Sequence, residues 1–282
     1  MKSNLSKTFR YINELGDELI FEPDYGFMIN KPTGIDSVTV SLSQAQGINQ
    51  VGASIQSTNV QPRPVTISGI LMGEFQKANK DKLISVIRPD LKGKLYADDY
   101  YIDVYVSESP AIEPVPAFAR FNFMLLAPYP YWQHDESIAV ELSSIRKMFK
   151  LPCNFTRPYQ FGERIENLFI NIENRGQLPV PFTVSFFARS ECSNPKLTNA
   201  NTGEYLLIKK PMVAGERITV EITHEKTFVT STVDGDIRGA MSLKSRLNRL
   251  AVGDNVLKPT VEGGGKIEVS VDYATEIVGV TL

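Results

Sequence analysis

Two acidic pairs in this sequence could exchange protons or hold a cation. Asp98 and Asp99 are adjacent, and Asp234 and Asp236 flank Gly235. Paired carboxylates can act as the acid and base of a glycosidase, and carboxylates spaced along a loop can bind calcium. Asp and Gly are also the ordinary residues of tight turns, and the glutamate that ends a calcium-binding loop is missing here. We therefore expect both pairs to be turn residues.

Histidine and cysteine are too sparse to indicate a metal centre or an activated nucleophile. The sequence contains His134 and His224, which fall in different predicted domains, and Cys153 and Cys192. Their spacings match no zinc-binding pattern, and no Gly-x-Ser-x-Gly motif of a serine hydrolase occurs. We expect both cysteines to be structural and both histidines to be exposed or hydrogen-bonded loop residues, and therefore no catalytic residue, no metal site and no cofactor.

A run of three glycines at 263–265 could cradle a phosphate group, but only if a helix N-terminus followed it. The alternation after the run predicts a strand instead. We therefore expect a hairpin turn at this position.

An aromatic-rich stretch could form a platform for sugars. Its residues are Tyr129, Tyr131, Trp132, Tyr159 and Phe161. Aromatic faces stack on the apolar faces of sugars, but the same side chains can pack a junction between domains. We favour the packing interpretation.

The composition indicates a globular protein of about two domains. The chain has 282 residues, of which 42% are hydrophobic and 22% charged, and single domains of roughly 150 residues are common. The net charge is −2, which argues against a polyanion as the main partner. No apolar run is long enough for a membrane span or a signal peptide, so we expect synthesis in a cytoplasm and no membrane span.

Alternation of apolar and polar residues predicts a mostly β protein. The alternating segments lie at 38–42, 65–71, 102–106, 121–125, 168–172, 218–222 and 267–273. One helix is expected at about 74–88, where Pro89 would end it. Its apolar face would consist of Phe75, Ala78, Leu83, Ile84 and Ile87. A weaker helical pattern at 137–150 competes with β-branched residues at its start, which favour a strand.

Proline residues indicate the domain boundary. Pro128, Pro130, Pro152 and Pro158 all fall between two predicted strands. We expect an N-terminal β domain with one α-helix at 1–135, a linker at 136–160 and a C-terminal β-sandwich at 161–282.

The segment 43–61 is rich in Gln, Ser, Asn and Gly and contains no charged residue. A loop or a long hairpin fits this composition, and long excursions from compact domains are often functional. The lack of charge favours a contact surface over a solvated tail.

Several turn-and-strand motifs follow one another along the chain. An opening with Phe21 and Tyr25-Gly26 precedes the strand that starts at Arg63-Pro64. The first domain closes on a Pro-aromatic-Trp motif, and the second contains an Asn-x-Gly turn and a Gly-Asp-Asn turn. The motif residues are Pro128, Tyr129, Pro130, Trp132, Asn174, Gly176, Gly253 and Asn255. In their order and spacing these motifs resemble the distal tail proteins of long-tailed, non-contractile bacteriophages, the siphovirus-type phage tail proteins.

The resemblance implies a structural virion protein at the distal end of the tail. The N-terminal domain would form a homohexameric ring, single or stacked in pairs, and the C-terminal domain would be a galectin-like or carbohydrate-module-like sandwich. Such a hub joins the tail tube protein to the tail-associated fibre or lysin protein and in some phages carries receptor-binding proteins, so it acts in host attachment. From the net charge of −2 we also expect no nucleic acid specificity.

Ring closure needs two different surfaces of the same chain to meet. We expect these contacts at strand edges and in the excursion at 43–61. The candidate interface residues are Gln44, Gln46, Ile48, Gln50, Val51, Ile55 and Gln56.

Two other interpretations remain. A carbohydrate-binding module for host cell-surface glycans would need an exposed aromatic platform, for which Tyr159, Phe161, Tyr205 and Tyr273 are candidates; alternation suggests that Tyr273 is buried. A glycan hydrolase would need a convergent acid–base set, which the sequence does not indicate.

Overall fold

The structure is a computed structural model, and it describes residues 9–72, 76–115, 118–141, 143–147, 162–166 and 169–281. The chain forms two compact units. The first unit is Met1–Asp135 with Glu276–Leu282, and the second is Glu136–Thr275. The division differs from the expected one because the expected linker begins with strands of the second unit and the last residues return to the first.

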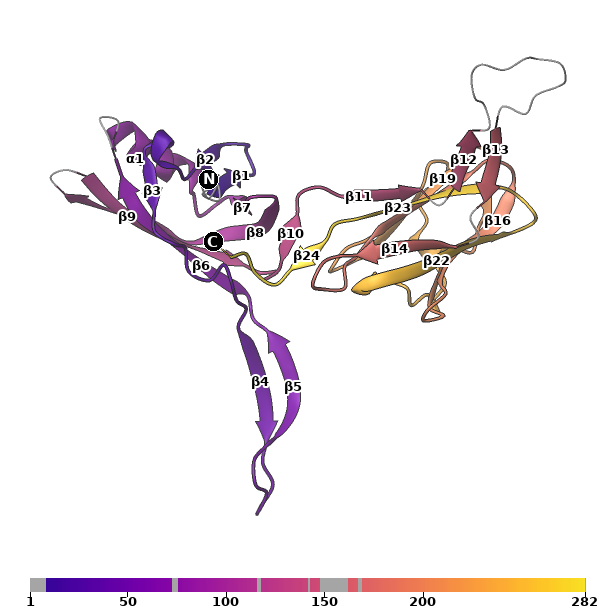
Figure 1. Cartoon of the computed structure of the whole chain (residues 1–282), viewed down its shortest axis with the longest axis horizontal. Helices are drawn as coiled ribbons and strands as arrows, with labels where there is room; N and C mark the ends of the chain where they lie inside the picture. The colour runs from indigo at the N-terminus through magenta and orange to yellow at the C-terminus, as the bar shows by residue number, and fades with distance from the viewer. Residues whose placement is uncertain are drawn as a thin grey trace. The chain divides into compact units, whose positions relative to one another are not determined.

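The first unit is built on a nine-stranded sheet (Figure 1) with strand order β2-β1-β7-β8-β9-β6-β3, to which β10 and β24 are added at β8. Its strands are β1 Phe9–Asn13, β2 Glu18–Ile20, β3 Phe27–Ile29, β6 Arg63–Leu71, β7 Lys92–Ala97, β8 Tyr100–Val115, β9 Phe118–Ala127, β10 Trp132–His134 and β24 Glu276–Ile277. A short 3-10 helix, η1, spans Pro23–Tyr25. The neighbouring strands of the sheet pair in an antiparallel manner, so one face can carry the buried half of each alternating pattern.

Helix α1, Gln76–Val86, packs against this sheet with a narrower face than expected. Leu83, Val86 and Ile87 join the core of the first unit, whereas Ala78 and Ile84 are exposed. The expected position of Phe75 lies outside the described residues. The helical face therefore follows the spacing Leu83–Val86–Ile87, which places Ile84 outside it.

The segment expected as a half-buried strand at 38–42 and an excursion at 43–61 forms one antiparallel hairpin. Its strands are β4, Val40–Ala45, and β5, Ser54–Val60, and among the described strands they pair with each other alone. Apart from half-buried Ala45, their residues are exposed. The expectation of a buried face at 38–42 was wrong because no core lies against β4.

The second unit is a β-sandwich, as expected for the C-terminal part. One sheet has the order β11-β23-β15-β19-β20-β21, and the other β14-β22-β16-β17 with β18 on β16. Their strands are β11 Ile138–Glu141, β14 Ile170–Asn174, β15 Thr183–Ala188, β16 Cys192–Asn199, β17 Tyr205–Leu207, β18 Pro211–Met212, β19 Arg217–Ile222, β20 Thr227–Ser231, β21 Gly235–Asp236, β22 Gly253–Glu262 and β23 Ile267–Tyr273. Buried side chains of both sheets form a single cluster.

Three further elements complete the second unit. β12, Ser143–Lys147, and β13, Gly162–Glu166, form a separate two-stranded ladder, and η2 spans Arg238–Ala240. The competing patterns at 137–150 resolve as strands in β11 and β12.

The glycine run at 263–265 makes a turn between sheets and not the expected hairpin. It joins β22 to β23, and these strands belong to different sheets. Gly263 and Gly264 have positive φ, and a Cβ on Gly265 would overlap the Glu191 carbonyl oxygen. Glycine is therefore required here by the turn and by the close approach of the Glu191 backbone.

Candidate assembly site

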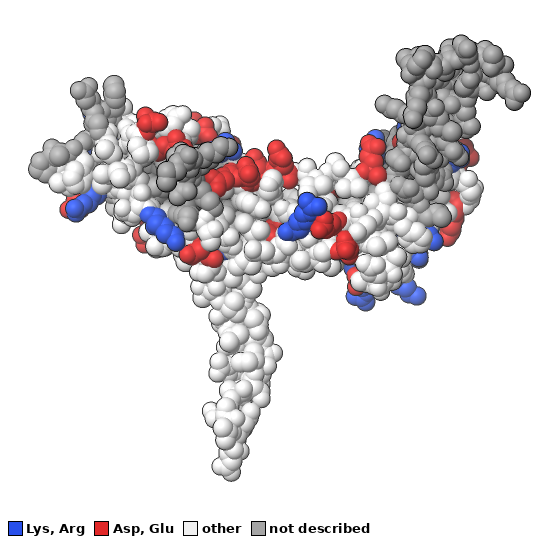
Figure 2. Space-filling model, in the orientation of Figure 1, with Lys and Arg blue, Asp and Glu red and all other residues white. Residues whose placement is uncertain are grey.

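The β4–β5 hairpin exposes apolar side chains on a segment without charge. Between Asp36 and Arg63 the sequence contains no Asp, Glu, Lys or Arg, and the hairpin in Figure 2 is correspondingly white. Ile48 is 98% exposed and Val51 101% exposed at its tip, and Ile55 is 52% exposed on β5. A contiguous uncharged surface with apolar residues at this exposure is typical of a binding surface.

Glutamine side chains organise the tip of the hairpin. The Gly47 amide donates to Gln50 Oε1 at 2.9 Å, and Gln50 Nε2 donates to Ser54 Oγ at 3.1 Å. Gln46 Nε2 donates to the Gln50 carbonyl at 3.2 Å. Two of the expected interface residues, Gln46 and Gln50, therefore shape the tip that presents Ile48 and Val51.

The other expected interface residues lie along the two strands. Gln44 pairs with Ile55, and Ser43 with Ser57, so Gln56 is the extra residue of a β-bulge. Bulges bend a ladder and hinder edge-to-edge aggregation. All seven candidates thus lie on one continuous hairpin.

A buried arginine stabilises the root of this hairpin, which is the end where β5 leads into β6. Arg63 is 2% exposed, and its Nε donates to the Pro130 carbonyl at 2.7 Å. Nη1 donates to the carbonyls of Gly34 and Ile35 at 3.0 and 2.8 Å, and Nη2 donates to the Val278 carbonyl. Burial lowers the pKa of Arg63, which the negative charge of Asp36 partly opposes.

The Pro-aromatic-Trp motif lies at the same root. Trp132 is fully buried in the first core, and its Nε1 donates to the Ile35 carbonyl at 3.1 Å. The Tyr129 hydroxyl donates to Glu276 Oε2 at 2.6 Å. Trp132 therefore packs inside the first unit, and Tyr129 ties the returning C-terminal segment to it. Tyr159 and Phe161 lie outside the described residues.

The two turn motifs of the second unit are also structural. Asn174 Nδ2 donates to the Leu178 carbonyl at 2.8 Å, and its Oδ1 accepts from the Gly176 amide at 3.0 Å. Fully buried Asn255 bonds both the amide and the carbonyl of Ala251, at 3.0 and 2.8 Å. Gly253 supplies a φ of 84° within that turn.

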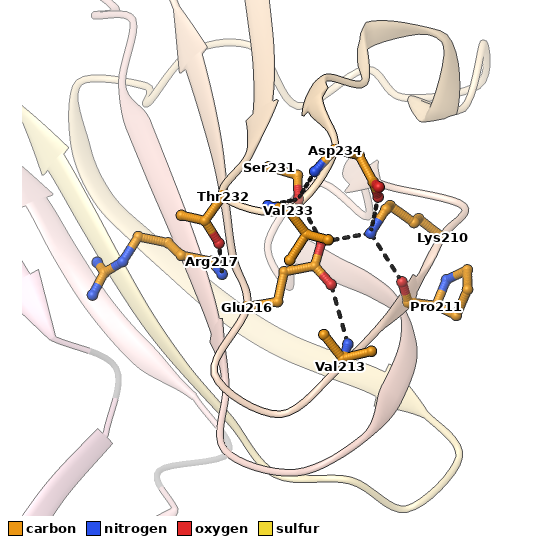
Figure 3. Close-up of polar contacts among 9 residues, drawn as sticks. All are labelled: Lys210, Pro211, Val213, Glu216, Arg217, Ser231, Thr232, Val233 and Asp234. Atoms are coloured by element: carbon orange, nitrogen blue, oxygen red, sulfur yellow. Dashed lines mark hydrogen bonds and ion pairs between the residues drawn. The ribbon is translucent and has the colours of Figure 1, made fainter.

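A buried polar network that the sequence analysis missed joins three loops of the second unit (Figure 3). Glu216, 2% exposed, accepts from Lys210 Nζ and from the Ser231 hydroxyl, each at 2.5 Å. Lys210 Nζ also lies 2.8 Å from Asp234 Oδ2. Burial alone would raise the pKa of Glu216, but the hydrogen bonds from Lys210, Ser231 and the Val213 amide, together with the charge of Lys210, outweigh burial and lower this pKa.

The residues considered for chemistry are spread over the fold. Asp98 and Asp99 form the turn between β7 and β8, His134 contacts the Tyr100 ring edge-on, and Cys192 is a buried free thiol. Cys153 lies outside the described residues. Among the described residues, no group of three or more His, Cys, Asp or Glu could hold a metal ion.

Of the aromatic residues considered for sugar binding in the second unit, Tyr205 and Tyr273 are described, and neither presents an open ring face. Tyr273 is 5% exposed, and its hydroxyl donates to the Glu173 carbonyl. Lys196 Nζ lies 4.3 Å from the centre of the half-buried Tyr205 ring. In the portion of the chain that the structure describes, no helix is both long and apolar enough to cross a bilayer.

Comparison with known proteins agrees with this architecture. Residues 175–276 match the siphovirus-type tail component, C-terminal domain. No curated protein sequence matches the chain. Among solved structures, the Dit protein of phage SPP1, described as a paradigm of the hub adsorption apparatus in phages infecting Gram-positive bacteria, superposes with a TM-score of 0.70 at 10% identity. That likeness covers 95% of this chain and 98% of the Dit chain.

A chain of the phage P2 baseplate, in its activated conformation with calcium, gives a TM-score of 0.48 at 9% identity over 98% of this chain and 100% of that one. The sequence match falls almost entirely within the second unit, whereas the structural likeness to SPP1 Dit covers nearly the whole chain. Residues 175–276 are thus similar to the siphovirus-type tail component, C-terminal domain, and the chain as a whole has the fold of SPP1 Dit.

Proposed function

We propose that this chain forms a homohexameric ring at the distal end of a phage tail, with the β4–β5 hairpin as the contact between subunits. The observation that carries the proposal is the hairpin's exposed, uncharged surface, with Ile48 and Val51 fully open to solvent. Leaving these side chains in water is unfavourable, and burial against a neighbour would recover about 1.5–3 kcal/mol for each.

The hairpin suits a ring because it differs from the surface that it would contact. A contact between two unlike surfaces is heterologous, and heterologous contacts close into rings when the rotation between subunits allows it. The sheet of the first unit ends in two short strands, β2 and β3. Their outer edges offer backbone groups to which a neighbouring strand can pair.

The ring would act as a structural hub and not as an enzyme. It would join the tail tube protein to a tail-associated fibre or lysin protein, and its second unit would carry a receptor-binding protein during host attachment. The support for this role is the match of the second unit to a tail component and the likeness of the whole fold to SPP1 Dit.

Solution mass measured by light scattering, with negative-stain imaging, tests the ring. We expect the wild-type chain to show about six times the subunit mass of 31.5 kDa and ring-shaped particles. Val51→Asp should give monomers, because closing the interface would bury an unpaired carboxylate. Leu15→Asp, at an exposed leucine of the same unit outside the hairpin, is the matched control and should keep the ring.

Two results would contradict the proposal. A wild-type chain that stays monomeric at every concentration would exclude self-assembly. A Val51→Asp variant that assembles as well as Leu15→Asp would exclude the hairpin as the contact. Thermal unfolding of each monomer would establish that the loss of assembly is not a loss of fold.

A further inference from the structure

The second unit contains a basic segment that the sequence analysis did not identify. From Ile237 to Gly253 the chain carries Arg238, Lys244, Arg246 and Arg249 and no acidic residue. The chain as a whole has a net charge of −2, so this segment is far more positively charged than the rest of the chain. A local excess of positive charge can attract anions even on a protein of neutral or negative net charge.

Buried residues fix this segment to the sandwich although it contains no long strand. The Ser242 amide donates to the Leu207 carbonyl, and the Arg246 amide donates to the Tyr205 carbonyl, each at 2.9 Å. Leu247 and Leu250 are buried in the core. The basic side chains between these anchors therefore start from an ordered backbone, which reduces the entropy lost on binding a ligand.

Both ends of the segment reach a pocket of about 260 Å³ beside the turn between β19 and β20. The charged side chains of its wall are Lys226, Arg238, Arg249 and Glu225, and the walls also include Thr223, His224 and Asn248. Three cations against one carboxylate leave an excess of positive charge. The volume is below that of pockets for drug-sized ligands, so the pocket suits a compact group.

The turn that forms one wall is well ordered. Thr223 Oγ1 accepts hydrogen bonds from the amides of Glu225 and Lys226, at 3.3 and 3.0 Å, and donates to the Lys226 carbonyl at 2.9 Å. Hydrogen bonds between Thr223 and both the amide and the carbonyl of Lys226 therefore fix the backbone from which the Lys226 side chain enters the wall of the pocket.

The cations of the pocket are not neutralised within the described part of the chain. No carboxylate oxygen of a described residue lies within 4.0 Å of Lys226 Nζ or of either guanidinium. Elsewhere in the unit Arg175 pairs with Glu173, and Arg189 pairs with Glu268. Two guanidinium groups free of carboxylates can bind a phosphate oxyanion through charge-assisted, bidentate hydrogen bonds.

We propose that this pocket binds a phosphate group, with Arg238 and Arg249 as its principal donors and Lys226 as a further positive charge. Lys244 and Arg246 do not line the pocket but belong to the same basic segment, and further positive charge on that segment would favour a ligand that carries several phosphates, namely a phosphodiester polymer. The proposal is independent of ring assembly, because every residue involved belongs to the second unit.

Calorimetric titration of the full chain with poly(glycerol phosphate) tests the proposal, with inorganic phosphate, dextran and polyglutamate as separate probes. The variant is Arg238→Gln/Arg249→Gln, whose side chains are exposed and make no hydrogen bond between described residues, so folding should persist. The matched control is Arg175→Gln/Arg189→Gln, which removes two exposed positive charges of the same unit outside the pocket.

We expect wild-type chain and control to bind the polymer, with an affinity that falls as salt is added. The pocket variant should bind it about tenfold or more weakly, as loss of charge-assisted hydrogen bonds implies. Inorganic phosphate should compete with the polymer, and dextran should not bind. Equal weakening in both double variants would overturn the pocket as the site, and absence of polymer binding would overturn the proposal altogether. Polyglutamate binding as tight as that of the polymer would overturn the phosphate assignment in favour of an acidic protein partner.

Discussion

The Arg63 side chain donates a hydrogen bond to the main-chain carbonyl of Val278, across 215 positions of sequence. The same guanidinium bonds the carbonyls of Gly34, Ile35 and Pro130. One side chain therefore joins the hairpin root, the Pro-aromatic motif and the returning C-terminal segment. Its partners are all carbonyl groups, whose partial charges are oriented by the surrounding backbone.

Replacing Arg63 by methionine should destabilise the first unit. The shorter, uncharged side chain would fill part of the volume, but four carbonyl groups would lose a donor, and an unsatisfied buried polar group costs about 1–3 kcal/mol. We expect the free energy of unfolding to fall by about 3 kcal/mol or more. Urea unfolding followed by Trp132 fluorescence measures this, because the chain has a single tryptophan and it lies in the first core. Arg120→Met, at an exposed position on β9, should leave the midpoint within experimental error.

Removing Glu276–Leu282 should destabilise the same unit, in part through the loss of a contact that Arg63 also makes. The deletion takes away the Val278 carbonyl, the Glu276 carboxylate that accepts from Tyr129, and buried Val280. Because both changes break one contact network, their combined effect on the free energy of unfolding should be smaller than the sum. A double-mutant cycle with Arg63→Met measures the coupling, and strict additivity would show that the C-terminal segment is held independently of Arg63.

Most of the fold could be predicted from local patterns. Period-two alternation at 65–71, 121–125, 218–222 and 267–273 matches β6, β9, β19 and β23, since each of these strands has one buried face. Alternation at 38–42 wrongly predicted a buried face, because the pattern indicates only that one side of the strand is apolar. It does not state whether the apolar side faces the protein's own core or a partner.

The root of the hairpin could be predicted only in part. Arg63 is in phase with buried Val65 and Ile67 on β6, so a charged residue on the inner face was visible as an anomaly in the sequence. Its partners Gly34, Pro130 and Val278 are remote, and no local pattern connects them. The network around Glu216 was missed for the same reason, since it depends on three loops meeting in the folded sandwich.

Gly279→Ala should displace the C-terminal segment. A Cβ at this position would overlap the Asp36 carbonyl oxygen, which belongs to the backbone and cannot rotate away. We expect a lower midpoint in the Trp132-detected unfolding curve, similar to that of the deletion. Gly239→Ala, where nothing lies within 4 Å and no positive φ is required, is the control and should unfold like wild type.

Acid should destabilise the second unit through Glu216. Burial opposes ionisation of this carboxyl, but the hydrogen bonds from Lys210, Ser231 and the Val213 amide and the charge of Lys210 together outweigh burial and hold its folded-state pKa below the ordinary value of 4.5. A lowered folded pKa gives stability that is present above the ordinary value and lost as pH falls through the folded value. Unfolding free energies measured by circular dichroism between pH 7 and about pH 3 should decline in wild type. Glu216→Gln should be less stable at neutral pH and decline less steeply, and identical slopes would assign the acid sensitivity to other carboxylates.

Gln50 should determine how well the hairpin tip is ordered before any partner binds. Its side chain accepts from the Gly47 amide and donates to Ser54, whereas the hairpin root is closed by a hydrogen bond from the Gln61 amide to the Thr39 carbonyl. Gln50→Ala should speed hydrogen exchange at the Gly47 amide and leave exchange at Gln61 unchanged, so the root serves as an internal control.

If the tip is the ring contact, ordering it on assembly adds an entropic cost of about 0.5–1.5 kcal/mol for each side chain immobilised. The same variant should then assemble only at higher protein concentration, although neither its charge nor its apolar side chains have changed. If Gln50→Ala speeds hydrogen exchange at Gly47 but leaves assembly unchanged, the order of the tip is irrelevant to the contact between subunits.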